Sequence, residues 1–165
     1  MVGVVRKKSG KGFTLMEALI VLALMTMAGS FILLVSMETY RGSSFRSERN
    51  TVVALLERAR AQSIGNVCIG TCTDGKPHGV AIRPGDRPNQ YVLFQGSDYA
   101  SRDSAADAVF DSNQLVSTSG LSEVTFAQLS LVSSTIGGST LTLSDAAGHI
   151  STITIGAEGQ ITWTN

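Results

Sequence analysis

Gly12-Phe13-Thr14-Leu15-Met16-Glu17, with the apolar run that continues to Met37, is the stretch that decides how this chain is organised. Residues 18–37 include no charged residue and no proline. About twenty apolar residues in an α-helix span the roughly 30 Å hydrocarbon core of a bilayer. The sequence therefore predicts a membrane-spanning helix over residues 13–37, with a single carboxylate near its start.

The residues before this run are basic. Arg6, Lys7, Lys8 and Lys11 lie within the first twelve residues, which contain no acid. The positive-inside rule then places the N-terminus in the cytoplasm and the rest of the chain across the membrane, as a single pass. The apolar run is longer than the 7–15 residues of a cleaved secretory signal, so an uncleaved anchor is the simpler interpretation. A plain anchor gives no reason for Glu17, or for a glycine directly before a phenylalanine.

The remaining charge is unevenly distributed. The chain has 13 basic and 13 acidic residues, but no Lys or Arg follows Arg102. A protein that holds nucleic acid uses many Lys and Arg contacts to phosphates. The C-terminal part therefore lacks the broad basic face of a nucleic-acid-binding domain, and we expect no nucleic-acid partner.

Residues 38–65 are predicted to continue the helix in amphipathic form. Apolar or small residues recur at spacings of three and four, and they are Val52, Leu55, Leu56, Ala59 and Ser63. Gly42-Ser43-Ser44 interrupts the helix propensity and is interpreted as a flexible joint, while Gly65-Asn66 supplies a stop signal.

Residues 66–165 are rich in Gly, Ser, Thr and β-branched residues and predict an antiparallel β domain. The expected strands are 67–69, 78–83, 90–95, 123–132, 140–144, 150–155 and 160–164. Residues 97–113 are interpreted as a long polar surface loop that includes one helical turn or a short strand, with Tyr99 and Phe110 as anchors. The fold class is α+β, with a long N-terminal helix packed on an antiparallel sheet.

Two strands carry finer expectations. In 123–132 we expect Val124, Phe126, Leu129 and Leu131 to point inward. In 150–155 the isoleucines at 150 and 153 are out of phase, which predicts a bulge or an edge position near Ser151.

Residues 11–37 resemble the prepilin signature of type IV pilins and type II secretion pseudopilins. The resemblance implies a leader of residues 1–12, cut by prepilin peptidase between Gly12 and Phe13, after which Phe13 becomes an N-methylated N-terminus. Glu17 then matches the family's glutamate, thought to neutralise the N-terminal charge of a neighbouring subunit during filament assembly. The implied partners are other pilin or pseudopilin subunits and the assembly machinery of the bacterial inner membrane.

Residues 50–165 look most like H-type minor pseudopilins and FimT-type minor pilins. Some FimT-type pilins that bind DNA carry a basic motif after the last glycine turn. Here Gly159 is followed by Gln160-Ile161-Thr162-Trp163, without a cation. The sequence thus favours a non-enzymatic structural subunit. A DNA-uptake or adhesion pilin and a membrane-anchored binding domain that never polymerises are the alternatives.

Cys68 and Cys72 allow three interpretations, namely half of a metal site, a redox pair or a small disulfide loop. A zinc site needs about four ligands, and neither His78 nor His149 stands at a diagnostic spacing. A redox motif normally has two intervening residues. We favour a disulfide, with two free thiols as the alternative, and expect no metal and no cofactor.

The other polar residues form no catalytic set. Asp103, Asp107 and Asp111 recur every four residues, but they lack the pattern of a calcium-binding loop. They are interpreted as a solvated face.

Overall fold

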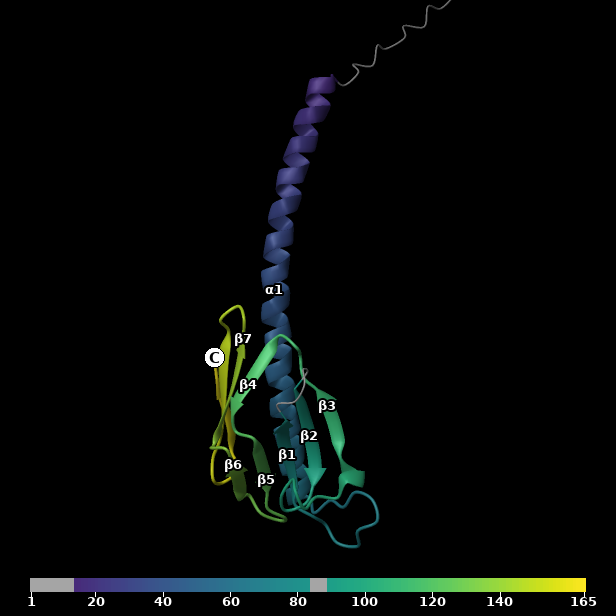
Figure 1. The fold of residues 1–165 in the computed structure, drawn as a ribbon, viewed down its shortest axis with the longest axis vertical. Coiled ribbons are helices and arrows are strands. Elements are labelled where there is room, and N and C mark those ends of the chain that lie inside the picture. Colours follow the sequence, from purple (N-terminus) through teal and green to yellow (C-terminus); the bar gives the residue numbers. More distant parts are fainter. Residues whose placement is uncertain (1–13, 84–88) are drawn as a thin grey trace, which may run out of the picture. The chain divides into compact units, whose positions relative to one another are not determined.

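The computed structural model describes residues 14–83 and 89–165, including every side chain in these ranges except those of residues 33–35. Within the described chain, one long helix, α1 (Leu15–Ile64), precedes nine β-strands (Figure 1). The chain divides into two compact units at the Tyr40–Arg41 bond. The α+β class and the antiparallel sheets are as the sequence predicts.

The strands follow one another along residues 78–164. They are β1 (His78–Arg83), β2 (Gln90–Gln95), β3 (Ala108–Asp111), β4 (Val116–Gly120), β5 (Glu123–Phe126), β6 (Ser133–Ile136), β7 (Thr140–Asp145), β8 (Ile150–Ile155) and β9 (Ile161–Thr164), with one 3₁₀ turn, η1 (Ser104–Ala106), before β3.

The first unit consists of the N-terminal half of α1. Every described side chain from Thr14 to Tyr40 is exposed, including large apolar ones such as Leu15, Leu22 and Phe31. An 18-residue window of α1 has a mean hydropathy of 2.6, so the helix is long and apolar enough to cross a membrane. Because these side chains lack an apolar environment within the chain, they need one outside it.

The C-terminal half of α1 belongs to the second unit and forms part of its core. All five residues of the predicted stripe are buried, from Val52 to Ser63. The four apolar residues of the stripe join one cluster with residues of β1, β2, β5, β7 and β8, among them Val80, Leu93 and Leu141. The periodicity of three and four thus identified the buried face of the helix correctly.

The interruption expected at residues 42–44 does not break α1, which continues through these residues. Tertiary contacts explain why the glycine and serines do not end the helix. The side chain of Asn113 donates a hydrogen bond to the hydroxyl of Ser44. The next residue, Phe45, is buried in the core.

Two antiparallel sheets make up the β part of the second unit. The five-stranded sheet has the order β3-β2-β1-β5-β6, and the four-stranded sheet has the order β4-β7-β8-β9. Val80 in the centre of the larger sheet is paired with Leu93 on one side and with Val124 on the other. These three side chains are buried and face the helix cluster.

The smaller sheet has sharply different faces. On one face, Leu141, Ile153 and Trp163 lie directly opposite one another on three adjacent strands. On the other face, threonines form two rows of three across the same strands. One row is Thr140, Thr154 and Thr162, and the other is Thr142, Thr152 and Thr164. This alternation has the period of two that half-buried strands require.

The strand expected at 123–132 is too long. β5 ends at Phe126, and the chain then turns, with the amide of Ala127 bonded to the carbonyl of Val132 at 2.9 Å. Val124 and Phe126 are buried as predicted, but Leu129 and Leu131 are 68% and 52% exposed. Leu129 has a φ of 53°, and its amide donates to the carbonyl of Ser63 at 3.0 Å. A backbone contact with the end of α1 therefore takes precedence over the strand pattern.

The bulge or edge position expected near Ser151 is also wrong. β8 lies inside its sheet and pairs in regular register with β7 and β9. Ser151 occupies an inward position, where its hydroxyl donates to the carbonyl of Thr164 at 2.8 Å, while Ile150 is exposed. A buried hydroxyl with a hydrogen-bond partner is tolerated in a core, so the strand needs no irregularity.

Three further observations concern short segments. Residues 67–69 form no strand, because the Val67 backbone bonds to Gln62 and Lys76 in a turn after the helix. β4 and β6 consist mainly of Ser, Thr and Gly, which carry little strand signal, and the sequence missed both. The predicted loop of residues 97–113 does contain a helical turn, η1, and a short strand, β3, as expected.

Candidate functional site

The start of α1 is built as a helix cap. The backbone amide of Ala18 bonds to the carbonyl of Thr14 at 3.1 Å, which is the first helical bond. The amide of Glu17 donates to the Thr14 hydroxyl at 3.2 Å. Thr14 is therefore the N-cap and Glu17 the third helical residue, the positions of Thr and Glu in a capping box. The Thr-x-x-Glu pattern is present in the sequence, but it was not identified from the sequence as a helix cap.

Glu17 is exposed in the first turn of α1, surrounded in sequence by exposed apolar residues. A carboxylate near a helix N-terminus is favoured by the helix dipole. Two effects thus act on Glu17 before any partner is considered: the dipole stabilises its charge, and an apolar environment would destabilise it. The predicted cleavage residues, Gly12 and Phe13, lie outside the described residues.

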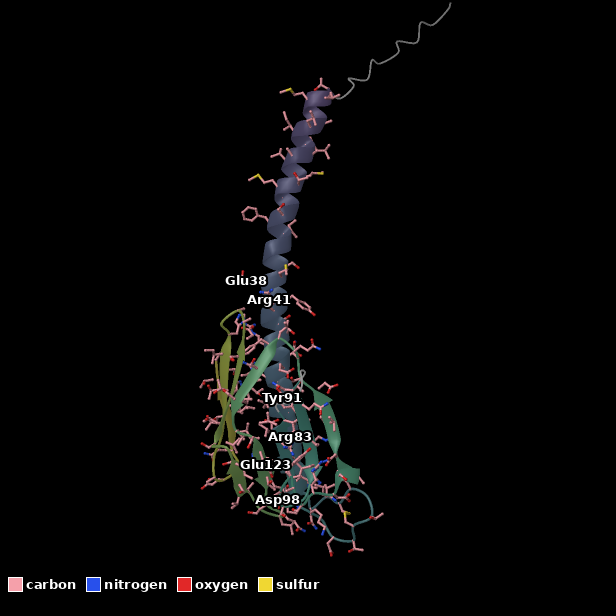
Figure 2. The ribbon with its side chains drawn as sticks, in the orientation of Figure 1. Glu38, Arg41, Arg83, Tyr91, Asp98 and Glu123 are labelled. Carbon is pink, nitrogen blue, oxygen red and sulfur yellow. A yellow bond between two sulfur atoms is a disulfide. The ribbon has the colours of Figure 1, made fainter. Side chains whose placement is uncertain are left out.

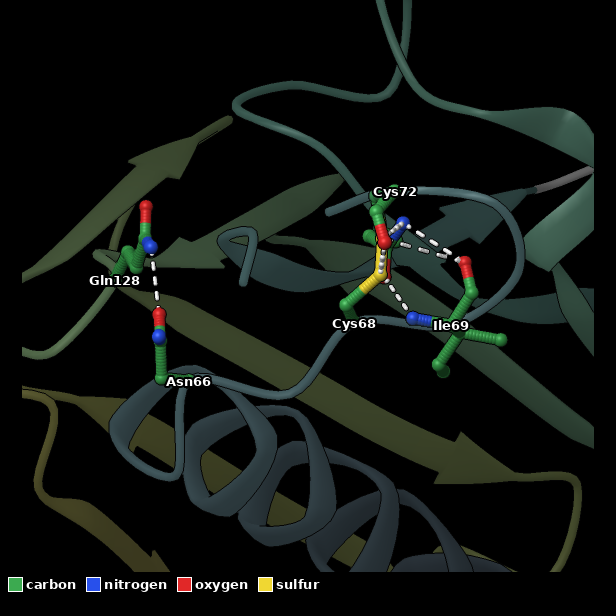
Figure 3. Close-up of a disulfide and its surroundings, with 6 residues drawn as sticks. Asn66, Cys68, Ile69, Cys72 and Gln128 are labelled. Atoms are coloured by element: carbon green, nitrogen blue, oxygen red, sulfur yellow. Dashed lines mark hydrogen bonds between the residues drawn. A yellow bond between two sulfur atoms is a disulfide. The ribbon is translucent and has the colours of Figure 1, made fainter. Parts of the chain in front are cut away.

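The two cysteines lie just after the end of α1. Cys68 and Cys72 are joined in a disulfide, and their Cα atoms are 6.0 Å apart (Figure 3). Inside the loop they close, the amide of Ile69 donates to Gln95 Oε1 at 2.7 Å, and Gln95 Nε2 donates to the Ile69 carbonyl at 3.2 Å. Gln95 is buried at the end of β2. Its role as the anchor of this loop has no signal in the sequence.

A polar cleft of about 660 Å³ lies beside the disulfide loop. Its walls come from the disulfide loop, the residues before β1, the end of β2 and the turn that follows it. Charged residues of both signs line it, including Asp74, Lys76, Arg102 and Asp103. Its size is that of a small-molecule site, but such sites are mostly apolar. The cleft suits a small hydrated ligand better than an apolar one.

The loop after β2 is held by one aromatic ring. Tyr99 packs edge-on against Phe94, with ring centroids 5.6 Å apart. The guanidinium carbons of Arg83 and Arg102 lie 3.7 and 3.6 Å from the centroid of the Tyr99 ring, and Arg83 is labelled in Figure 2. Tyr99 thus anchors the loop as predicted, whereas the two cation–π contacts were not foreseen.

The same loop is tied down by charge. The amide of Tyr99 donates to Glu123 Oε1 at 2.7 Å. Arg102 forms an ion pair with Asp107 at 2.7 Å, which raises the pKa of the guanidinium. Because the Tyr99 ring is already covered by two cations, it does not offer the open aromatic face on which a nucleic-acid base would stack.

His78 is fully buried at the start of β1. Its amide donates to the hydroxyl of Ser63 at 2.7 Å, but neither ring nitrogen has a hydrogen-bond partner in the described chain. Burial lowers the pKa of His78. The polar backbone of Lys76 nearby acts in the opposite direction, but its effect is the smaller of the two. The imidazole is therefore a neutral core residue and not a proton-transfer group facing a cleft.

The second histidine, His149, lies in the turn between β7 and β8. Its Nδ1 is 2.7 Å from Asp145 Oδ2, and its ring stacks on Phe45 with centroids 5.7 Å apart. Burial alone would raise the pKa of Asp145, but hydrogen bonds from His149 and from the Ala147 backbone together lower it. Asp145 is thereby kept ionised and fixes the turn.

The three regularly spaced aspartates have separate structural tasks. Asp103 caps η1, Asp107 pairs with Arg102, and Asp111 accepts a bond from Gln90 at 3.0 Å. Asp103 and Asp111 are exposed but Asp107 is half-buried in its ion pair, so the prediction of a solvated face is only partly confirmed. In the part of the chain that the structure describes, no group of three His, Cys, Asp or Glu residues is placed to hold a metal ion.

Comparisons with known proteins add no relative. No family model, no curated protein and no solved structure matches this chain. The function must therefore be argued from the residues themselves.

Proposed function

We propose that this protein is a minor pilin or pseudopilin, a structural subunit that prepilin peptidase cleaves and that a type II secretion or type IV pilus machinery assembles into a filament. The observation that carries the proposal is the placement of one exposed carboxylate, Glu17, in the capped first turn of an exposed apolar helix. The cap residue, Thr14, is the second residue after the Gly12–Phe13 bond in the sequence, where the resemblance places the cut.

Cleavage at that bond would change the electrostatics of the helix start. It would create an α-amino group four residues before Glu17. Opposite charges attract far more strongly in a medium of low dielectric constant than in water. Pairing between Glu17 and the amino group of a neighbouring subunit would therefore offset the cost of placing both charges in an apolar filament core.

The length of α1 supports a filament role. Helices of globular proteins average about 11–12 residues, whereas α1 has 50. Its first half exposes apolar side chains and its second half provides the core of the β unit. A subunit that packs one half of its helix against sister helices, and carries its folded part on the other half, has this division of surfaces.

The decisive experiment is co-expression of the full chain with a prepilin peptidase, followed by intact mass and N-terminal sequencing. We expect a mature chain that starts at N-methylated Phe13. Gly12→Leu should block the cut, and Gly10→Leu, which leaves Gly12 in place, should not. Retention of residues 1–12, under conditions where the peptidase processes a known prepilin, would contradict the proposal.

The polar cleft beside the disulfide favours a second candidate, a membrane-anchored binding domain that does not polymerise. Its volume of about 660 Å³ and its mixed charges suit a small polar ligand. In that case the helix would serve only as an anchor, and Glu17→Ala would leave the function of the protein intact.

A further inference from the structure

One end of the β unit combines exposed apolar residues with cations, and it lies where α1 enters the unit. Here we define the entry face as Arg41 and Arg46 of α1, Leu115 before β4, Ala147 of the β7–β8 turn and Ile150 at the start of β8. These residues are exposed, and they have no role in the core or in the proposed cleavage.

The strand register places these residues at the same end. Val116 is paired with Asp145 across β4 and β7, and Ser144 is paired with Ile150 across β7 and β8. The residue before β4 and the turn between β7 and β8 are therefore neighbours. Leu115 and Ile150 are each 58% exposed there, so two large aliphatic side chains face outward at this end.

Side-chain contacts tie these connections to α1. Asn113 is hydrogen-bonded to Ser44, and His149 stacks on Phe45. Two depressions flank Phe45. One, of about 90 Å³, is lined by Arg41 and Leu115, and the other, of about 290 Å³, is lined by Arg46 and Ile150. Each depression thus combines an arginine with an exposed aliphatic side chain.

The charge of the face is positive. Arg41 and Arg46 are exposed, and neither lies within 4.0 Å of a carboxylate of the described residues. Among the described side chains that line the depressions, Asp145 is the one carboxylate, and its oxygens are engaged by His149 and by the Ala147 amide. Glu48 is buried, and Glu38, one turn before Arg41, is the nearest exposed acid in the sequence.

The position of the face along α1 indicates its partner. Arg41 follows Met37 by four residues, which is about 6 Å along a helix axis. The headgroup layers bring a bilayer to about 40–45 Å, against roughly 30 Å for the hydrocarbon core. Each headgroup layer is therefore about 5–8 Å deep, so Arg41, about 6 Å beyond Met37 along the helix, lies within reach of it.

We propose that the entry face contacts anionic phospholipid headgroups before the subunit leaves the membrane, with Arg41 and Arg46 on the phosphates and Leu115 and Ile150 at the acyl boundary. Juxtamembrane cations are attracted to anionic lipid, and aliphatic side chains partition into its interface. The inference rests on the proposed function, because it requires the apolar half of α1 to be inserted.

The test uses the full chain in nanodiscs of phosphatidylcholine alone and of phosphatidylcholine with phosphatidylglycerol. A nitroxide is attached to a cysteine at position 115, 150, 131 or 22, with the native disulfide kept oxidised. Collision with a water-soluble nickel chelate and with oxygen then reports whether each label lies in water or in lipid. Leu131 is the control of matched exposure, at 52%, and Leu22 reports insertion.

In anionic discs we expect several-fold lower nickel collision at 115 and 150 than at 131. Arg41→Gln with Arg46→Gln should return both sites to the level of 131, whereas Arg58→Gln, another exposed arginine of α1, should not. Equal collision at 115, 150 and 131, with position 22 in lipid, would overturn this inference alone. If positions 115 and 150 were protected from nickel equally in neutral and anionic discs, the role of the arginines would be overturned. A label at position 22 that lies in water would overturn the proposed function.

Discussion

Gln95 and Ile69 form a reciprocal pair of hydrogen bonds, in which the buried glutamine amide satisfies both the N–H and the carbonyl of Ile69. The pair resembles two residues bonded across a sheet, although one partner is a side chain. Gln95 Nε2 also donates to Cys72 Sγ at 3.6 Å, so the glutamine fastens the Cys68–Cys72 loop to the end of β2 at Ile69 and at the disulfide.

Gln95→Met should therefore loosen this loop. The substitution keeps the side-chain volume but leaves the two Ile69 groups unpaired, and an unsatisfied buried group costs about 1–3 kcal/mol. We expect the free energy of unfolding to fall by that amount and the Ile69 amide to exchange faster with solvent. Gln90→Met, on the exposed start of the same strand, is the control and should change stability by less than about 0.5 kcal/mol. Unchanged exchange at Ile69 would refute the anchoring role.

The disulfide should add stability without being required for folding. A short disulfide loop contributes at the low end of the usual 2–4 kcal/mol. The loop lies outside the core cluster. We expect Cys68→Ser with Cys72→Ser to lower the urea midpoint while leaving the far-ultraviolet circular dichroism unchanged. A double variant that fails to fold would show that the loop is part of the core.

His78 should make stability depend on pH below neutrality. Its pKa is lowered from the usual 6.5 in the folded protein, so below 6.5 the unfolded state binds the proton first. Its contribution is fully present above pH 6.5 and is lost as the pH falls toward the folded-state pKa. Urea unfolding between about pH 7.5 and pH 5 should give a steeper loss for the natural protein than for His78→Leu. Parallel curves for the two proteins would contradict the prediction.

The Tyr99 ring should stabilise the loop that covers the outer face of the larger sheet. Tyr99→Leu removes two cation–π contacts of about 0.5–1 kcal/mol each and an aromatic pair of similar size. We expect unfolding to become easier by about 1–3 kcal/mol, measured by urea denaturation. Tyr99→Phe keeps the ring and should stay within about 0.5 kcal/mol of the natural protein. If Tyr99→Leu were equally neutral, the two arginines would be incidental neighbours.

Glu17 can be tested by separating its charge from its position in the capping box. Gln is also accepted at this position of a capping box, so Glu17→Gln preserves the helix start and removes the charge. We expect Glu17→Gln to be cleaved normally but excluded from filaments, as judged by shearing and immunoblotting. Thr14→Ala removes the hydroxyl that caps Glu17 and keeps the charge, so it should still assemble. Assembly of Glu17→Gln would refute the pairing role.

The helix and the main strands could be predicted because their signals are local. Residues 18–37 are uncharged and mostly apolar, the stripe from Val52 to Ser63 has the period of a helix, and β1, β2 and β8 were predicted with their observed ends. Leu129 and Ser151 could not be placed correctly. Their environments depend on a bond to the end of α1 and on the carbonyl of a neighbouring strand, and both partners are remote in sequence.

For the candidate site, the sequence contained the residue types but not their neighbours. The capping box of Thr14 and Glu17 was legible as a pattern of four residues. The entry face was not, because it joins Arg41 and Arg46 to Leu115 and Ile150, which only the strand register brings together. Surfaces assembled across turns of different hairpins carry no periodic signal along the chain.

The two threonine rows of the smaller sheet have a consequence for errors in assembly. A shift of one residue between β7 and β8 would turn the isoleucines of β8 to solvent and bury its threonines, since side chains alternate between faces. A shift of two would leave one threonine of β7 and one of β8 without a threonine opposite it. The segments Thr-Leu-Thr, Thr-Ile-Thr and Thr-Trp-Thr therefore favour one register among β7, β8 and β9. The same pattern disfavours mispaired strands, both within one chain and between the edge strands of adjacent molecules.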